Sequence, residues 1–275
     1  MLRKFAIALA FAALVAGCAT SPTGRKQLMI VSESQAIASS RQAYVQEMGK
    51  YKKEGKLVTD PRVINRVKVI TERLVAQAVK MRPDSAKWEW TVEVVDDPQN
   101  VNAWCMAGGR MAIYTGLLLK VDPTDDELAQ VMGHEIAHAL ANHTAERMSV
   151  AMASQLGVVA AGILLDQSAS TIAAGVAAAQ VAVNLPNSRQ AESEADRIGI
   201  ELAAKAGYDP QAAVTLWQKM AAVGGGKGPP QFLSTHPSDA TRQQALAKLV
   251  PQMMPYYQAA GTPPIYPVRV GTAAV

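Results

Sequence analysis

Hydrophobic side chains recur every three or four positions between Pro61 and Met81, the spacing of one face of an α-helix. The members of this stripe are Val63, Ile64, Val67, Ile70, Leu74, Val75 and Ala78. Proline at the first position fits the first turn of a helix, where its missing N–H loses no partner. A helix is also predicted from Ser32 to Lys53, with Ser32 or Ser34 as its N-cap residue.

Other stretches alternate between apolar and polar residues and are rich in β-branched side chains. Trp88–Val95 (WEWTVEVV) predicts a strand, and Asn102–Leu118 predicts two short strands around Gly108–Gly109. The capping box Thr124-Asp125-Asp126-Glu127 then opens a helix. Further helices are predicted over residues 188–206, 209–223 and 238–254. The fold class predicted from this pattern is mainly α with a small β-sheet (α+β).

Residues 148–183 are rich in alanine and valine and are interrupted by Asp166-Gln167-Ser168. The two halves are apolar but short, and each carries a glutamine, Gln155 or Gln180. We interpret them as a buried or cleft-covering helical hairpin, because a bilayer-spanning helix needs about 20 apolar residues. A hairpin that dips into a membrane is the alternative.

Residues 1–17 have the pattern of a secretory signal peptide: a short basic start, an apolar run and small residues. The segment Leu14–Cys18 (LVAGC) resembles a bacterial lipobox, in which Cys18 becomes the first mature residue and carries the lipid. Ala19, in place of Asp, resembles lipoproteins sent to the outer membrane. We therefore expect a lipid anchor at the periplasmic face of the outer membrane; the alternative is an ordinary signal peptide with an incidental cysteine.

The remaining boundaries follow from composition. Residues 18–31 are expected to form a lipidated tether, residues 32–254 one folded domain, and residues 255–275 a proline-rich, irregular surface tail. If Cys18 is lipidated, Cys105 has no partner within the chain, which excludes an intramolecular disulfide.

Composition narrows the classes of function. Of the 275 residues, 49% are hydrophobic and only 5% are aromatic, so the core must be built from aliphatic side chains. The formal net charge is +4, and two of the basic residues lie in the expected signal peptide. Without a basic stripe or interleaved aromatic residues, the chain does not have the pattern of a nucleic-acid-binding protein. Composition gives no indication of the oligomeric state.

The run GHEIAHALANH holds three of the four histidines. On a helix, His134 and His138 point about 40° apart, whereas His143 points to the far side. His134 and His138 can therefore share one metal ion, with Glu135 on their flank. This is the HExxH motif, in which two imidazoles hold zinc and the carboxylate activates water. We interpret His143 as an ordinary surface or core histidine.

Catalytic zinc takes three protein ligands, so the motif requires a third residue. Glu192 and Asp196 lie one helical turn apart, while Glu194 points roughly 200° from Glu192 and is expected to face solvent. We predict Glu192 as the third ligand and Asp196 as the acceptor of a ring N–H from a ligating histidine. The alternative is a solvated acidic face.

His236 precedes Pro237 in a predicted loop, from which a side chain can reach into a cleft, although a single loop histidine commonly has no such role. Arg242, six residues later, could support either an oxyanion or this loop.

Together HEIAHALANH, ESEADRIGIELAAKAGYDP and LSTHPSDATR resemble the zinc metallopeptidase family of the CAAX prenyl endopeptidases and bacterial envelope proteases, peptidase family M48. The resemblance runs from near Thr23 to the helix after His236 and makes residues 32–254 a zinc metallopeptidase domain. It implies a zincin-like fold, one Zn²⁺ per chain, and a single-domain, lipid-tethered member.

The resemblance also assigns roles to residues of this chain. It implies His134, His138 and Glu192 as ligands and Glu135 as the general base. It further implies that Asp196 supports the ligands and that His236 is a mobile residue beside the metal. Residues 102–118 would include an edge strand to which an extended substrate adds. Many relatives have proline before the glycine pair where this chain has Met106-Ala107, so substrate preference is open.

The function implied is a zinc-dependent endopeptidase of the HExxH gluzincin type. Its expected substrates are unfolded or misassembled envelope proteins, since an edge strand binds backbone more than side chains. The alternative is a chaperone or assembly factor for outer-membrane proteins with a gated, rarely active zinc site.

Overall fold

The computed structural model describes residues 18–183, 188–223, 231–236 and 240–271. The expected signal peptide, residues 1–17, lies outside them. The chain divides into two compact units. One unit comprises the chain up to Ala36 together with Asn142–Leu185, and the other comprises Ile37–Ala141 together with Pro186–Val275.

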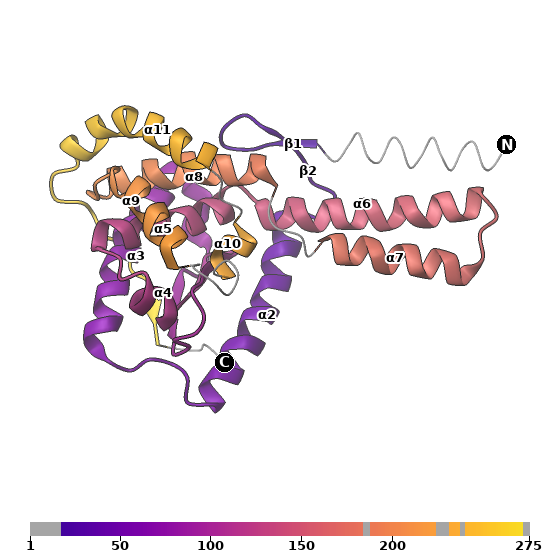
Figure 1. Cartoon of the computed structure of the whole chain (residues 1–275), viewed down its shortest axis with the longest axis horizontal. Coiled ribbons are helices and arrows are strands. Elements are labelled where there is room, and N and C mark those ends of the chain that lie inside the picture. The colour runs from indigo at the N-terminus through magenta and orange to yellow at the C-terminus, as the bar shows by residue number, and fades with distance from the viewer. Residues whose placement is uncertain (1–17, 184–187, 224–230, 237–239, 272–275) are drawn as a thin grey trace. The chain divides into compact units, whose positions relative to one another are not determined.

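The larger unit holds most of the helices and a four-stranded sheet (Figure 1). Its helical elements are α2 (Glu33–Lys53, whose first turn belongs to the smaller unit), α3 (Pro61–Met81), η1 (Pro83–Lys87), α4 (Thr115–Lys120), α5 (Asp125–Leu140), α8 (Arg189–Lys205), α9 (Ala212–Val223), α10 (Gln231–Thr235) and α11 (Ala240–Ala259). Its strands are β3 (Thr91–Val95), β4 (Ala103–Met106), β5 (Arg110–Tyr114) and β6 (Arg269–Val270). The α+β class predicted from the sequence is confirmed.

Local signals place the helix starts as predicted. Helix α3 begins at Pro61, where the Asp60 side chain caps it by accepting a hydrogen bond from the Arg62 N–H. The capping box that begins α5 is complete: the Thr124 hydroxyl accepts from the Glu127 N–H, and the Glu127 carboxylate accepts from the Thr124 N–H. The start of α5 is thus fixed by its own sequence.

The sheet has the order β4-β5-β3-β6. Strand β3 is parallel to both β5 and β6, and β4 pairs with β5 in antiparallel register, Cys105 opposite Met111. Within the described chain β4 therefore has one free edge. Helix α5 packs against β4, so the edge strand lies beside the helix that carries the HExxH motif.

The core forms around α5, in which every residue from Glu127 to Leu140 is buried. Helices α3, α8 and α9 pack against it, and apolar side chains of the sheet complete one continuous cluster. Because α5 is covered on all sides, its side chains have no room to rearrange. The orientations of its polar side chains are therefore fixed.

The smaller unit contains the antiparallel pair β1 (Cys18–Thr20) and β2 (Lys26–Leu28), and helices α6 (His143–Leu164) and α7 (Ala169–Val183). The two helices lie side by side as a hairpin (Figure 1). Residues 18–28, expected to be a tether, instead form a hairpin of strands that packs on α6.

The two helices expected over residues 148–183 are present, but of the two expectations for them, a buried or a cleft-covering hairpin, the buried one is wrong. Helix α6 starts earlier, at His143, and carries exposed apolar side chains along its length. Among the described helices, α6 alone is long and apolar enough to cross a membrane by length and composition. The sequence pattern predicted two helices but could not show what covers them.

The C-terminal segment is in part the irregular surface tail that its prolines indicated, since residues 260–268 contain no helix or strand and are mostly exposed or half-buried. Helix α11 continues through Pro255 to Ala259, five residues beyond its expected end at 254. Tyr266 then donates its N–H to the carbonyl of Glu72, and Arg269 donates to the carbonyl of Trp90, adding β6 to the sheet. These long-range backbone hydrogen bonds are invisible in local composition.

Candidate metal centre

Helix α5 brings two imidazoles to one point. His134 and His138 are one turn apart, both buried, and their Nε2 atoms lie 3.1 Å from each other. Glu192 of α8 faces them, with carboxylate oxygens 3.3 Å from the His134 Nε2 and 3.4 Å from the His138 Nε2. The structure therefore brings together the three ligands expected from sequence.

Two glycines permit this approach of the helices. A Cβ atom on Gly199 of α8 would lie 2.8 Å from the His134 backbone nitrogen, and one on Gly133 of α5 would lie 2.9 Å from the Gly199 carbonyl oxygen. Distances this short exclude a side chain at either position without movement of the backbone. The backbones of α5 and α8 are therefore in direct contact next to the first histidine.

His236, directly after α10, supplies a fourth donor. Its Nδ1 lies 3.2 Å from the His134 Nε2 and 3.0 Å from a Glu192 oxygen. One donor atom from each of His134, His138, Glu192 and His236 lies within 4.8 Å of all the others. In a tetrahedral zinc site with bonds of 2.0–2.1 Å, ligand atoms are about 3.3–3.4 Å apart, close to these separations.

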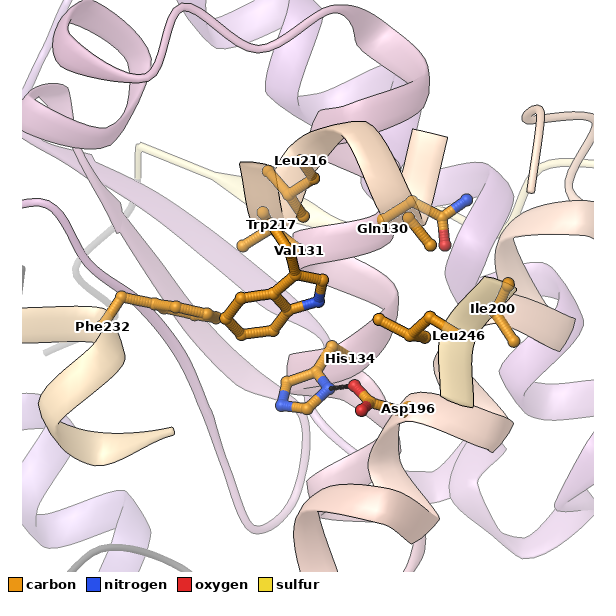
Figure 2. Close-up of a pocket in the computed structure, with 10 residues that line it drawn as sticks. Gln130, Val131, His134, Asp196, Ile200, Leu216, Trp217, Phe232 and Leu246 are labelled. Atoms are coloured by element: carbon orange, nitrogen blue, oxygen red, sulfur yellow. Dashed lines mark ion pairs between the residues drawn. The ribbon is translucent and has the colours of Figure 1, made fainter. Parts of the chain in front are cut away.

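Asp196 and Arg242 contact the ligand residues but are not part of the four-donor cluster. The Asp196 carboxylate lies 3.0 Å from the His134 Nδ1 (Figure 2). Arg242 donates from Nε and Nη2 to the two Asp196 oxygens at 2.8 and 2.7 Å, and its Nη1 lies 3.0 Å from Glu192. Because Asp196 accepts from Nδ1 of His134, Nε2 is the ring nitrogen that faces the ligand cluster.

The electrostatics favour a cation. Burial lowers the pKa of His134, but the contacts with Asp196 and Glu192 outweigh burial and raise it to about 9. Burial opposes ionisation of Glu192, yet contacts with the three histidines hold its pKa below the ordinary value. When the histidines are neutral, the carboxylates of Glu135, Glu192 and Asp196 exceed the single positive charge of Arg242, and a divalent cation would neutralise this excess. The donor set and charge thus fit a metal ion.

The Glu135 carboxylate lies beside the ligand cluster. It is buried, its Oε1 is 3.4 Å from the His236 Nε2, and that oxygen has no hydrogen-bond partner within the described parts of the chain. Burial raises its pKa. Burial, with a smaller contribution from Glu135, also raises the pKa of Cys105 in strand β4. Helix α5, which carries Glu135, packs against this strand.

Two aromatic residues that sequence reasoning missed enclose the centre. Phe232 of α10 is buried and stacks on His236, with 4.6 Å between ring centroids. The Trp217 indole lies against Phe232 and under the Arg242 guanidinium, and Figure 2 shows both rings beside the pocket at His134. An aromatic residue four positions before a loop histidine was the available signal for Phe232.

Two other expectations have clear outcomes. His143 is buried in the first turn of α6 and is not part of the ligand cluster. Glu194 was expected to face solvent, and this is wrong, because its exposure is only 5%. The reason is that α8 is covered on more than one side, with most residues from Ala191 to Ala204 buried.

The α+β fold, the buried HExxH helix and the His–His–Glu cluster define a metallopeptidase. The model of peptidase family M48 matches residues 61–250, and the chain belongs to this family. The predicted family is therefore confirmed.

Several relatives share the sequence over most of the chain. The mitochondrial metalloendopeptidase OMA1 of Bos taurus is 32% identical over 254 residues, covering 88% of this chain and 48% of that protein. The human protein of the same name is 33% identical, with the same coverage. The beta-barrel assembly-enhancing protease of Yersinia pestis is 30% identical, covering 78% and 43%. The chain thus spans about half the length of these relatives.

Proposed function

We propose that this protein is a zinc-dependent endopeptidase that cleaves unfolded or misassembled proteins of the cell envelope. The observation that supports it most is the convergence of His134, His138 and Glu192 beside the buried Glu135. Two imidazoles and one carboxylate are a set typical of catalytic zinc, and we expect one Zn²⁺ per chain.

Different residues of the chain carry out different steps of peptide hydrolysis. Zinc, when bound, supplies Lewis-acid polarisation of the scissile carbonyl and acidifies water. Glu135 takes the proton from the attacking water and delivers it to the leaving amine. Its raised pKa suits a group that must both accept and release a proton near neutral pH. The contact between Asp196 and His134 keeps this imidazole oriented.

In this proposal, His236 controls whether water and substrate can reach the metal. A fourth protein donor closes a zinc site, because catalytic zinc keeps one position for water or substrate. The Nδ1 position of His236 supports a resting form in which it takes the fourth place. When the segment carrying His236 moves away, the same imidazole becomes available to assist the oxyanion. Arg242, bound to Asp196 and to the carbonyl of His236, acts on the loop and ligands more than on an oxyanion.

The substrate class rests on strand β4. Its outer edge offers backbone groups to an extended peptide, which would then lie beside α5, the helix that carries Glu135. An edge that binds through backbone favours unfolded segments of many sequences. The name of the Yersinia pestis relative, a beta-barrel assembly-enhancing protease, supports envelope proteins as substrates and the bacterial envelope as location.

Cys18 is the proposed lipid attachment site, which would hold the mature protein at the periplasmic face of the outer membrane. The lipobox-like segment Leu14–Cys18 supports this. Cys18→Ser should abolish metabolic labelling with a radioactive fatty acid. Full labelling of the variant would remove Cys18 from this role.

A second function, chaperone or assembly factor for outer-membrane proteins, is favoured by one observation: His236 fills the site. It predicts that the protein suppresses aggregation of an unfolded outer-membrane protein without cleaving it.

The mature chain incubated with unfolded casein separates these functions. The peptidase cleaves casein, Glu135→Gln retains its metal and does not, and Glu201→Gln on the far part of α8 serves as the matched control with unchanged cleavage. A zinc-loaded wild-type protein that leaves casein intact while preventing aggregation would support the assembly factor instead.

A further inference from the structure

The hairpin of α6 and α7 carries an unusual amount of exposed apolar surface. Only 17% of the most apolar 18-residue window of α6 is buried. The exposed large side chains in and just after this helix are Val150, Met152, Leu156, Val159, Ile163, Leu164 and Leu165. Such a helix requires a covering that the smaller unit does not itself provide.

The direction of these side chains identifies the kind of covering. Val150 and Val159 are nine residues apart, so they point in nearly opposite directions at about 100° per residue. Both are exposed, at 49% and 36%. Exposed apolar side chains therefore lie on two opposite sides of α6. A helix that is apolar on more than one side lies either in the core of a large protein or in a membrane, and the exposure of these side chains leaves the membrane for α6.

Charge and length agree with a bilayer. Between Arg147 and Arg189 the sequence has a single charged residue, Asp166, which lies in the turn at the hairpin tip. The uncharged run from Met148 to Leu165 is roughly 27 Å long as a helix, close to the ~30 Å of a hydrocarbon core. The polar tip Asp166–Ser168 would then reach the opposite headgroup layer. Helix α7 is shorter, and bilayers thin locally around short segments.

The two helices also pack as helices do in lipid. A Cβ atom on Gly162 would meet Ile172 of α7 at 2.4 Å, and one on Gly175 would meet Val158 of α6 at 2.7 Å. One glycine on each helix thus receives a side chain of the other. Close approach through small residues is the way that helices associate where lipid removes the hydrophobic driving force.

Polar contacts are concentrated at the base of the hairpin. Arg25 pairs with Glu146 through two bonds of 2.6 Å, and Gln27 donates to the same carboxylate. The Ser149 hydroxyl accepts the N–H of Val31. The segment that begins at Cys18 is therefore fixed to the charged end of α6, as expected for the part of the unit that lies at a membrane surface.

We propose that the α6–α7 hairpin inserts into a lipid bilayer and anchors the protein independently of any lipid on Cys18. The proposal does not depend on the catalytic role of the metal centre. It replaces the sequence-based interpretation of a covered hairpin.

Flotation of the full mature chain carrying Cys18→Ser tests the insertion. With vesicles of phosphatidylethanolamine and phosphatidylglycerol, this variant should float and should remain bound after washes with high salt and alkaline carbonate. Adding Leu156→Asp should reduce the bound fraction roughly 100-fold, because a carboxylate in the middle of a spanning helix is strongly disfavoured. The matched control is Leu119→Asp on α4, where leucine is similarly exposed (67% against 61%) and binding should not change.

A fluorescent label on Ser154→Cys, midway along α6, gives a second readout that does not depend on recovery of the protein. Its emission should shift to the blue with vesicles and be quenched by lipids carrying a quencher at the bilayer centre. Absence of flotation, or equal flotation with Leu156→Asp, would overturn the proposal. Self-association in lipid-free buffer that Leu156→Asp abolishes would overturn it in favour of a second copy of the chain.

Discussion

At the scale of single residues, the position of His134 determines the geometry of the site. Its Nε2 belongs to the ligand cluster, while its Nδ1 meets Asp196, which is in turn held by Arg242. Buried carboxylate–imidazole contacts of this kind fix both the tautomer and the ring plane. Arg242 thus holds Asp196, and Asp196 orients the expected ligand His134, although neither Arg242 nor Asp196 is part of the ligand cluster.

Asp196→Asn should weaken zinc binding by about 10–100-fold, as loss of such supporting contacts typically does. The amide keeps the size of the side chain but loses the charge that holds the His134 N–H and Arg242. Competition with a fluorescent zinc chelator measures the affinity. Unchanged zinc affinity and casein turnover together would reduce Asp196 to a purely structural residue.

His236→Ala should raise basal casein cleavage and self-cleavage and should weaken resting zinc binding. The reason is that a fourth donor occupies the position that water and substrate need. Ser234→Ala, an exposed change on the same helix α10, is the control. Turnover and zinc affinity should be measured on one preparation. A fall in turnover of roughly 10²–10³ would instead indicate that His236 mainly stabilises the oxyanion.

Residue spacing predicted most of this cluster, since one helical turn separates the members of both pairs, His134 with His138 and Glu192 with Asp196. Residue spacing did not predict burial where the covering comes from elements distant in the sequence. Glu194 is buried because α8 is covered on more than one side. Phe232 and His236 are one helical turn apart, but the sequence pattern placed His236 in a loop, so their stacking was not expected.

At the scale of elements, the contact of α5 with α8 decides whether the ligands meet. Gly199→Ala should separate the two backbones, since the added Cβ would lie 2.8 Å from the His134 nitrogen. We expect a stability loss of about 1–3 kcal/mol from overpacking and weaker zinc binding, because Glu192 moves with α8.

Thermal unfolding with and without zinc measures both effects of Gly199→Ala. The matched control is Gly49→Ala in α2, where a Cβ meets nothing within 4 Å. That change should be neutral or stabilising, because alanine favours helix by up to about 1 kcal/mol. Equal behaviour of the two variants would show that the α5–α8 approach is not needed for the site.

Strand β3 contains a carboxyl group that links stability to pH. Glu93 is buried, one of its oxygens has no hydrogen-bond partner in the described structure, and burial raises its pKa to about 7 from the ordinary 4.5. An acid with a raised pKa binds its proton more tightly in the folded state. The folded state therefore loses stability as pH rises from about 4.5 through 7.

Glu93→Gln should accordingly raise the Tm at pH 8 and change it little at pH 4, where the wild-type carboxyl is protonated. The expected gain at pH 8 is roughly 3 kcal/mol, since the pKa is raised from 4.5 to about 7 and one pKa unit corresponds to about 1.4 kcal/mol. Urea unfolding at both pH values measures this gain in the free energy of unfolding, and thermal unfolding measures the Tm. An equal shift at the two pH values would show that Glu93 is not the group that titrates.

The elements themselves were predictable where the signal is local. The capping box at Thr124 and the stripe of α3 are complete within one helix, and both helices begin where expected. The covering of α6 and the pairing of β6 with β3 depend on partners far away in the sequence or outside the chain. Composition alone therefore could not show what covers the hairpin or that the C-terminal segment adds a strand to the sheet.

At the scale of the whole molecule, the metal centre belongs entirely to the larger unit, and the exposed hairpin belongs to the smaller one. The larger unit draws its ligands from α5, α8 and the residue after α10, which span residues 134–236. The two proposals accordingly predict that catalysis and membrane attachment can be removed separately, the first by Glu135→Gln and the second by Leu156→Asp.

Metal analysis of purified variants tests the central claim, a zinc peptidase site held by His134, His138 and Glu192. Mass spectrometry should find one zinc per mature chain in wild type and in Glu135→Gln. It should find almost none after His134→Ala, His138→Ala or Glu192→Ala, with each variant still folded by circular dichroism. Full zinc occupancy in Glu192→Ala, or a wild-type protein that binds no zinc, would contradict the claim.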